Sequence, residues 1–439
     1  MVLDVRYYIE TYGCAANRAD ELVLKEVLRR EGWLEVGIDE ADVIVLNTCG
    51  VKKPTEDRMF SRLSKLSSYG KPIVVAGCLP RINPNRLFLY EWSVALDPSN
   101  VHKIAEGCRL AIQGARHLLL ERSSLSDKPA FISMPLSGPI GVIEIQEGCN
   151  LACSFCATRF ARGRVVSFPP GSIIRALKEI VKKGAWEVWF TGQDVAAYGY
   201  DGIDLPKLLD MVASLEEEFM IRVGMMTPIY AKRVKNGLAE VLGRKVFRFV
   251  HLPVQSGSDK MLKVMARGHK VDLFYELVDF FRSKVENLTL ATDIIVGHPG
   301  EEEEDFELTV RMLEKTKPDV VNLSKYGDRP GTPASKMKKL PSHIVAKRSR
   351  YLYGLILELM KERNEKWIGW EGSAVVTQRG TKKGTWMARN FSYKPIVIKS
   401  DGDVLGARID VLIEGARTTH LVGRLLANPK KEIKIEVPH

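Results

Sequence analysis

The sequence predicts an α/β protein built from three parts: an N-terminal doubly wound parallel sheet, a central partial (β/α)6 barrel, and a C-terminal small antiparallel β-barrel. Two stretches in which β-branched apolar runs alternate with helical patterns predict the two parallel arrangements. Short alternating runs separated by Gly, Asp and Asn predict the third. Because 439 residues is long for a single core, we expect several domains. The expected boundaries are residues 1–112, a linker at 113–135, then 136–368 and 369–431.

The first part combines strand patterns with regularly placed cysteines. Strands are expected at residues 5–11, 42–47 and 72–77. A cysteine comes directly after each of them: Cys14, Cys49 and Cys78. The carboxyl ends of parallel strands share one edge of the sheet, so these thiols are expected to converge as a second three-thiolate site, most simply an iron–sulfur cluster. Asn17 and Asp20 follow the first cysteine, either as part of that site or as helix caps.

The stretch EGCNLACSFC places Cys149, Cys153 and Cys156 in the spacing C-x3-C-x2-C. Three thiolates can hold three irons of a cubic iron–sulfur cluster and leave the fourth iron open for chemistry. Zinc is the alternative, but structural zinc normally has four Cys or His ligands, and the next histidine, His251, is far along the chain. The remaining cysteine, Cys108, lies in a helical pattern and is expected to be a buried hydrophobic residue.

Six strands are expected in the second part, at residues 142–145, 187–192, 221–226, 247–252, 290–297 and 321–326. In parallel barrels the chemistry collects in the loops that follow the strands. Three arginines follow the cysteine loop: Arg159, Arg162 and Arg164. They either approach phosphates or form a solvated basic loop.

The third part is strongly basic. Residues 371–431 contain 11 Lys and Arg against 5 Asp and Glu, and the entire chain has a net charge of +11. Aromatic and cationic residues alternate in Trp386, Arg389, Phe391, Tyr393 and Lys394, a mixture that stacks on bases and neutralises phosphates. Core packing is the alternative for Trp386. The basic composition favours a polyanionic partner such as RNA.

Five ordered motifs, EGCNLACSFC, TGQDVAAYG, HLPVQSGSDKMLKVMARG, TDIIVGHPGEEEEDF and RPGTPASKM, resemble the radical S-adenosylmethionine (SAM) methylthiotransferases, which modify tRNA or a ribosomal protein. TYGCAANRAD, NTCGV and AGCLPR are similar to the segments that hold that family's auxiliary cluster. Residues 369–431 resemble the TRAM domain, a small RNA-binding barrel. The stretch CSFCATRFARGRVVSF resembles archaeal and eukaryotic members that act on N6-threonylcarbamoyladenosine.

The resemblance implies two [4Fe-4S] clusters and SAM. The cluster on Cys149, Cys153 and Cys156 would reduce SAM to a 5′-deoxyadenosyl radical, and sulfur at the Cys14, Cys49 and Cys78 cluster would be inserted at a C–H carbon, with the methyl group coming from a second SAM. Contacts to SAM or substrate are expected from polar loop residues, whose alternative role is turn chemistry. These residues are Gly192, Gln193, Asp194, Gln255, Ser256 and Asp293.

The expected activity is conversion of N6-threonylcarbamoyladenosine at tRNA position 37, 3′ of the anticodon, to its 2-methylthio derivative. Isopentenyladenosine tRNA and a ribosomal-protein aspartate remain alternative substrates, and an iron–sulfur protein that binds RNA or transfers electrons without SAM chemistry is an alternative of another class. The expected partners are the tRNA anticodon loop, an external electron donor and a sulfur donor. No apolar run approaches the ~20 residues of a membrane span, and the first ten residues lack a signal-peptide pattern, so no membrane partner and a cytoplasmic location are expected.

Overall fold

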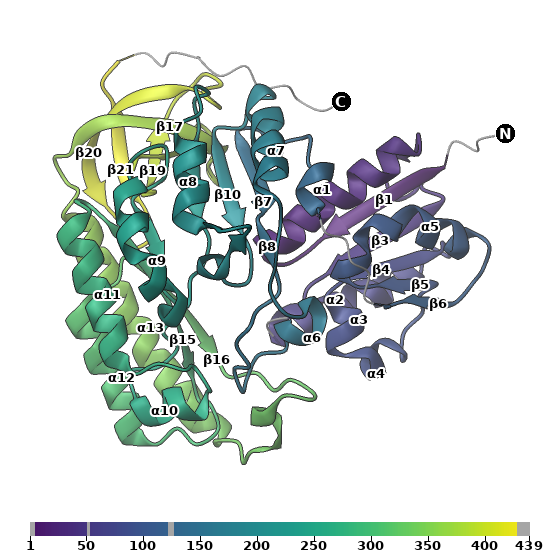
Figure 1. Ribbon diagram of the computed structural model, residues 1–439, viewed down its shortest axis with the longest axis horizontal. Coiled ribbons are helices and arrows are strands. Elements are labelled where there is room, and N and C mark those ends of the chain that lie inside the picture. Colours follow the sequence, from purple (N-terminus) through teal and green to yellow (C-terminus); the bar gives the residue numbers. More distant parts are fainter. Residues whose placement is uncertain (1–4, 51–52, 122–126, 428–439) are drawn as a thin grey trace. The chain divides into compact units, whose positions relative to one another are not determined.

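The computed structural model describes residues 5–50, 53–121 and 127–427 (Figure 1). They divide into two compact units. Unit 1 consists of Met1–Met134, Val142–Ala176 and Gly327–Lys336, and unit 2 of Pro135–Gly141, Leu177–Tyr326 and Met337–His439. Unit 1 therefore contains both groups of three cysteines: the N-terminal trio (Cys14, Cys49, Cys78) and the central trio (Cys149, Cys153, Cys156).

Unit 1 is built on a parallel sheet with the strand order β2-β1-β3-β4-β5-β6. Its strands are β1 (Arg6–Thr11), β2 (Leu34–Glu35), β3 (Val43–Thr48), β4 (Ile73–Gly77), β5 (Val94–Leu96) and β6 (His117–Leu119). The main helices are α1 (Ala15–Arg30), α2 (Lys53–Ser67) and α5 (Ile104–Ile112), with short helices α3 (Leu79–Ile82), α4 (Pro84–Leu87) and η1 (Pro98–Lys103). The expected linker contributes β6 and the short helix η2 (Lys128–Phe131).

Helices cover both faces of this sheet. Every residue of β3 is buried, as is typical of a parallel strand with helices on both sides. Ile44 and Leu46 pack with Met59 and Phe60 of α2, while α1 and α5 also contact β3. The doubly wound arrangement predicted from the sequence is confirmed. Cys108 of α5 is fully buried, as expected.

Unit 2 contains the strands of the predicted partial barrel. β10 (Glu187–Thr191) pairs with β13 (Met220–Val223), and the second sheet has the order β14-β15-β16. Its strands are β14 (Phe249–His251), β15 (Thr289–Val296) and β16 (Val320–Lys325). β7 (Ile140–Glu144), which begins in unit 2, is the remaining strand of the β13-β10-β7 sheet. A bridge between Met225 and His251 connects the two sheets, so the six expected strands are confirmed.

The helices that alternate with these strands are α7 (Pro170–Lys182), α8 (Leu205–Ala213), α9 (Pro228–Val241), α10 (Asp259–Val264), α11 (Val271–Lys284), α12 (Glu303–Thr316) and α13 (Ser342–Glu365). Smaller elements are η3 (Val195–Ala197), β11 (Gly199–Tyr200) and β12 (Ile203–Asp204). Glu302 and Asp305 form a capping box at the start of α12. The chain then enters the C-terminal barrel.

That barrel is closed, with the strand order β17-β18-β19-β21-β20. Its strands are β17 (Glu371–Arg379), β18 (Thr385–Arg389), β19 (Pro395–Lys399), β20 (Arg408–Ala416) and β21 (Leu421–Leu425). Inward-facing Val376, Ile396, Ile398 and Val411 fill its core, as expected from the alternating pattern. The predicted third architecture is thus confirmed.

The expected RNA contacts of this barrel need correction at three positions: Trp386 takes the alternative role of core packing, and Tyr393 and Lys394 are engaged within the protein. Trp386 belongs to the barrel core and is 6% exposed. The Tyr393 hydroxyl donates to Glu187, at the start of β10, and the Lys394 ammonium donates to Asp319, just before β16. The loop between β18 and β19 therefore packs beside β10 and β16 of the same unit, and this packing engages Tyr393 and Lys394 in contacts within the protein.

Candidate functional site

The N-terminal trio lies at the carboxyl edge of the sheet in unit 1. Cys14 is the N-cap of α1, Cys49 directly follows β3, and Cys78 follows β4 as the N-cap of α3. Gly13 (φ 123°) lies so close to Cys49 that a Cβ on this glycine would be 2.4 Å from the Cys49 Cβ. Only glycine allows this approach, and it brings the first two cysteines of the trio together.

The pKa values of two thiols of this trio, Cys14 and Cys78, are shifted in opposite directions. The hydrogen bond between the Cys14 and Cys49 thiols, supported by the charge of Arg162 and opposed by burial, lowers the pKa of Cys14 to about 6. Burial raises the pKa of Cys78 to about 12, although Arg162 works in the opposite direction. One arginine thus acts on two cysteines of the trio, and a positive charge favours the thiolate form that binds metal.

The central trio lies in the loop between β8 (Gln146–Glu147) and α6 (Thr158–Arg162). The Cys149 N–H donates to the Gly163 carbonyl at 3.1 Å, which closes the loop. Gly148 (φ 84°) has no room for a side chain, because a Cβ there would be 2.0 Å from the Arg164 carbonyl oxygen. Cys149 and Cys156 are half-buried and Cys153 is buried. Backbone geometry therefore fixes where the three sulfurs are presented.

The two trios are neighbours within unit 1. Cys78 packs with Ile82 against Ala157 and Ala161, which belong to or adjoin α6. The guanidinium of Arg329 interacts electrostatically with Cys49, of the N-terminal trio, and with Cys156, of the central trio.

Arg329 is fixed in this position by an acid of the N-terminal region. Its Nη1 is 2.7 Å from a Glu56 carboxylate oxygen, and both side chains are almost fully buried. The RPGTP stretch that carries Arg329 therefore folds with the cysteine loops.

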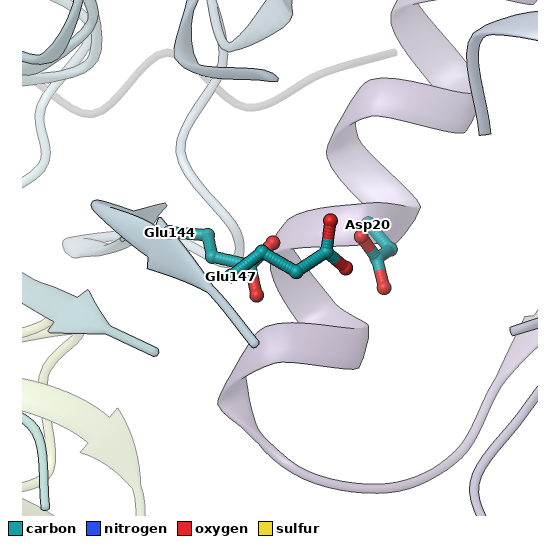
Figure 2. Close-up of side chains that lie close together, drawn as sticks. All are labelled: Asp20, Glu144 and Glu147. Carbon is teal, nitrogen blue, oxygen red and sulfur yellow. The ribbon is translucent and has the colours of Figure 1, made fainter. Parts of the chain in front are cut away.

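A buried cluster of charges lies next to the trios. Asp20 comes from α1, and Glu144 and Glu147 come from the segment that precedes the cysteine loop (Figure 2). Their oxygens lie within 4.8 Å of one another. The Lys128 ammonium is 2.7 Å from Asp20 and 2.9 Å from Glu147, and the Arg162 guanidinium is 2.6 Å from Asp20 and 2.8 Å from Glu147. The carboxylates are thus paired with cations, which makes this five-residue group a salt-bridge network rather than a metal site.

The charges of this network balance. Burial raises the pKa of Glu144 to about 8, so this carboxyl is largely neutral at pH 7. Two carboxylates, Asp20 and Glu147, then face two cations. Buried ions persist only when they are paired in this way.

Two expectations about these residues need correction. Arg162 is neither a phosphate contact nor part of a solvated loop, because it is buried within the network. Asp20 and Asn17 lie inside α1, whose N-cap is Cys14, so neither caps the helix. Asn17 instead donates to the Thr48 carbonyl at 2.8 Å, and thereby connects the first cysteine loop to the end of β3.

The predicted SAM-contacting residues are all in unit 2. Gly192, Gln193 and Asp194 follow β10. Asp194 is fully buried and accepts from the backbone N–H of Thr227, which precedes α9. Burial raises the pKa of Asp194 to about 6. This carboxylate therefore links the loops after β10 and β13, and its contact with SAM stays a prediction.

The other three residues lie beside one another at β15. Gln255 forms backbone hydrogen bonds with Asp293 and Ile295 and has a φ of 82°, a conformation that costs a non-glycine residue about 1–3 kcal/mol and is often found at functional sites. The Ser256 hydroxyl is 3.3 Å from that of Thr309. Asp293 accepts from His251 at 2.9 Å and from Asn322 at 2.7 Å.

The donor set of unit 1 fits iron–sulfur chemistry. Each trio offers three sulfurs, the number that leaves one iron of a cubic cluster open. The arginines beside the thiols, Arg162 and Arg329, are themselves held by buried acids. Fixed positive charges of this kind stabilise anionic cluster–thiolate centres.

Comparison with known proteins agrees with the fold and the cysteine pattern. Residues 143–313 match the radical SAM superfamily and residues 6–96 match an uncharacterized protein family, UPF0004. Radical SAM methyltransferase TsrM from Kitasatospora setae, a solved structure, is 14% identical, with a TM-score of 0.57 over 76% of this chain and 75% of that one. The fold and the cysteine loop thus define a radical SAM protein, a class whose chemistry uses a [4Fe-4S] cluster and SAM.

Curated relatives identify the family. A probable threonylcarbamoyladenosine tRNA methylthiotransferase from Methanothermobacter thermautotrophicus is 41% identical over 90% of this chain and 94% of that protein. The probable enzyme of the same name from Pyrococcus abyssi is 37% identical over 96% of this chain and 100% of its own length. The Mus musculus enzyme is 31% identical over 99% and 75%. This chain belongs to the threonylcarbamoyladenosine tRNA methylthiotransferase family. Among the described residues, no helix is long and apolar enough to cross a membrane.

Proposed function

We propose that this protein converts N6-threonylcarbamoyladenosine at position 37 of tRNA to its 2-methylthio derivative. The observation that carries the proposal is the pair of neighbouring cysteine trios in unit 1, in a chain that matches a probable methylthiotransferase over 96% of its length. One trio suffices for SAM cleavage, whereas sulfur insertion needs a second place to hold sulfur. The proposed location is the cytoplasm.

In this proposal Cys149, Cys153 and Cys156 hold one [4Fe-4S] cluster, and Cys14, Cys49 and Cys78 hold a second. When bound, the clusters supply the one-electron reduction of SAM and the sulfur that is transferred. The protein's own residues position and shield these groups. Gly13 and Gly148 allow the close backbone approaches that present the sulfurs, and an external electron donor and a sulfur donor complete the system.

Arg162 and Arg329 have electrostatic roles in this proposal. Arg162 acts on Cys14 and Cys78, and Arg329 acts on Cys49 and Cys156. Their positive charges offset the negative charge of thiolate-bound clusters, and the buried acids that hold them keep the charges in place. In unit 2, we assign Gly192, Gln193, Asp194, Gln255, Ser256 and Asp293 to contacts with SAM or the substrate base.

The test is mass spectrometry of tRNA nucleosides after anaerobic incubation with reconstituted protein, SAM and dithionite. One tRNA sample carries threonylcarbamoyladenosine, a second carries isopentenyladenosine, and a third carries unmodified adenosine at this position. A methylthio product formed only on the first sample supports the proposal. A product on isopentenyladenosine alone would refute the substrate assignment. Formation of 5′-deoxyadenosine without any methylthio nucleoside would keep the radical enzyme and reopen the substrate, including the ribosomal protein.

A further inference from the structure

Unit 2 contains a cavity of about 240 Å³. Arg222 of β13, Thr289 of β15 and Asn322 of β16 line it, and Arg389 and Tyr393 of the C-terminal barrel close one side. Side chains two residues apart along a strand share a face, so Thr289 lies on the same face of β15 as Asp293. The cavity thus adjoins the Asp293 carboxylate, to which Asn322 donates at 2.7 Å.

Arg222 is the unusual residue of this cavity. Its Nε has no hydrogen-bond partner within the part of the chain that the structure describes, and no ion pair there includes it. Three aromatic rings surround the guanidinium, with centroids 5.8 Å (Trp189), 5.1 Å (Phe249) and 5.4 Å (Tyr393) from its Cζ. Aromatic faces attract a cation but do not replace the acceptors that five N–H donors require.

The acids near the cavity are already engaged with other groups. Asp319 pairs with Lys394 at 2.8 Å and Arg363 at 3.0 Å. Glu187 accepts from Tyr393 and lies 4.0 Å from Arg389. Among the cations named here, Arg222 is therefore the one that has no carboxylate partner in the described part of the chain.

A second polar group in the cavity lacks a partner. The Thr289 hydroxyl belongs to a residue that is only 2% exposed and has no hydrogen-bond partner among the described residues. An unpaired buried polar group costs about 1–3 kcal/mol. A cation and a hydroxyl without partners among the described residues lie at the same cavity, which suits a ligand that carries an anionic group and a polar group.

We propose that this cavity receives the threonylcarbamoyl substituent of the substrate adenosine and that Arg222 binds its carboxylate. This inference rests on the proposed function and adds the determinant of substrate choice. The threonylcarbamoyl group carries a carboxylate, a hydroxyl and an amide-like carbamoyl, whereas the isopentenyl group is a hydrocarbon. The guanidinium matches a carboxylate in a bidentate geometry, and the Thr289 hydroxyl offers a hydrogen bond to the polar part of the same substituent.

The experiment compares two anticodon stem-loops, one with threonylcarbamoyladenosine and one with its threonyl methyl ester, which lacks the negative charge and carries one additional methyl group. Wild-type protein, reconstituted anaerobically, should bind and convert the acid roughly 10- to 100-fold better than the ester, the range expected for a charge-assisted contact. Arg222→Gln should reduce this ratio to near one by losing affinity for the acid. Arg222→Lys should keep part of it. The matched control is Arg233→Gln, at an exposed residue of α9 whose guanidinium lies over Tyr230, and it should behave as wild type.

The outcomes separate this inference from the proposed function. If wild type converts the acid and the ester equally well, the carboxylate is not recognised and the inference fails, while the methylthiotransferase activity stands; this comparison needs no variant to fold. If Arg222→Gln weakens SAM binding and leaves the acid-to-ester ratio unchanged, the carboxylate bound by Arg222 belongs to SAM, and the inference is overturned. If wild type methylthiolates only isopentenyladenosine, the substrate assignment and this inference both fail.

Discussion

Replacement of Arg162 by methionine tests how the region around the cysteine trios is held together. Arg162 donates at 2.6 Å to Asp20, at 3.0 Å to Glu144 and at 2.8 Å to Glu147, and its side chain is 1% exposed. With Glu144 neutral, the wild-type network has no net charge; the variant would leave two carboxylates facing Lys128 alone. Removing one partner from a buried ion pair typically destabilises by about 3–5 kcal/mol. We expect Arg162→Met to cost this much.

Hydrogen–deuterium exchange of α1 in the cluster-free protein measures this effect directly, because Asp20 lies in that helix. A loss of 3–5 kcal/mol corresponds to a roughly 150- to 4,000-fold loss of amide protection. Arg164→Met is the matched control: Arg164 is exposed two residues away, and its replacement should change stability by less than about 0.5 kcal/mol. Equal protection of α1 in the two variants would refute the structural role of the network.

Two further predictions follow from the charges of the described residues. Burial raises the pKa of Glu144 to about 8 from a usual value of 4.5. The folded state therefore holds this proton more tightly than the unfolded state does. The associated stabilisation is complete below pH 4.5 and is lost as the pH rises toward 8. The side chain of the Glu144→Gln variant cannot ionise, so the melting temperature of the variant relative to that of wild type should rise between pH 5 and 8.5, by the equivalent of at most about 5 kcal/mol. A difference in melting temperature that does not change with pH would contradict the buried neutral carboxyl. Because Trp386 and Lys394 are buried and the half-buried Tyr393 is bonded to Glu187, tRNA contacts of the barrel are expected from exposed cations such as Lys382 and Lys383. Replacing both lysines by Gln should weaken tRNA binding. It should also reduce the slope of log affinity against log salt concentration by about one unit for each phosphate that is no longer neutralised. An unchanged slope would exclude this surface as a tRNA contact.

The sequence predicted the strands and the placement of the cysteines because these depend on local patterns. Each cysteine of the N-terminal trio follows its strand within three residues, so the edge at which they meet follows from a parallel sheet. The three architectures were predictable for the same reason, since alternation and turn residues are local signals.

The charge network was not predictable in this way. Lys128 lies in a stretch that was expected to be a linker, yet it is 1% exposed and bonded to Asp20, 108 residues away. Nothing in a local pattern distinguishes a buried lysine with three acid partners from a solvated one. Tyr393 and Lys394 were misjudged for a related reason, because the sequence of a loop does not indicate which strands it packs against. Arg222 stands out only when its missing acceptor is visible in three dimensions.

The central claim is that the central trio serves SAM cleavage and the N-terminal trio serves sulfur insertion, and Cys49→Ala tests it most directly. The reconstituted variant is incubated with SAM, reductant and tRNA that carries threonylcarbamoyladenosine, and 5′-deoxyadenosine and methylthio nucleoside are quantified in the same sample, beside Cys153→Ala and wild type. The account predicts that Cys49→Ala still releases 5′-deoxyadenosine but forms no methylthio product, and that Cys153→Ala forms neither. Methylthio product from Cys49→Ala at the wild-type level would contradict the role of the N-terminal trio in sulfur insertion.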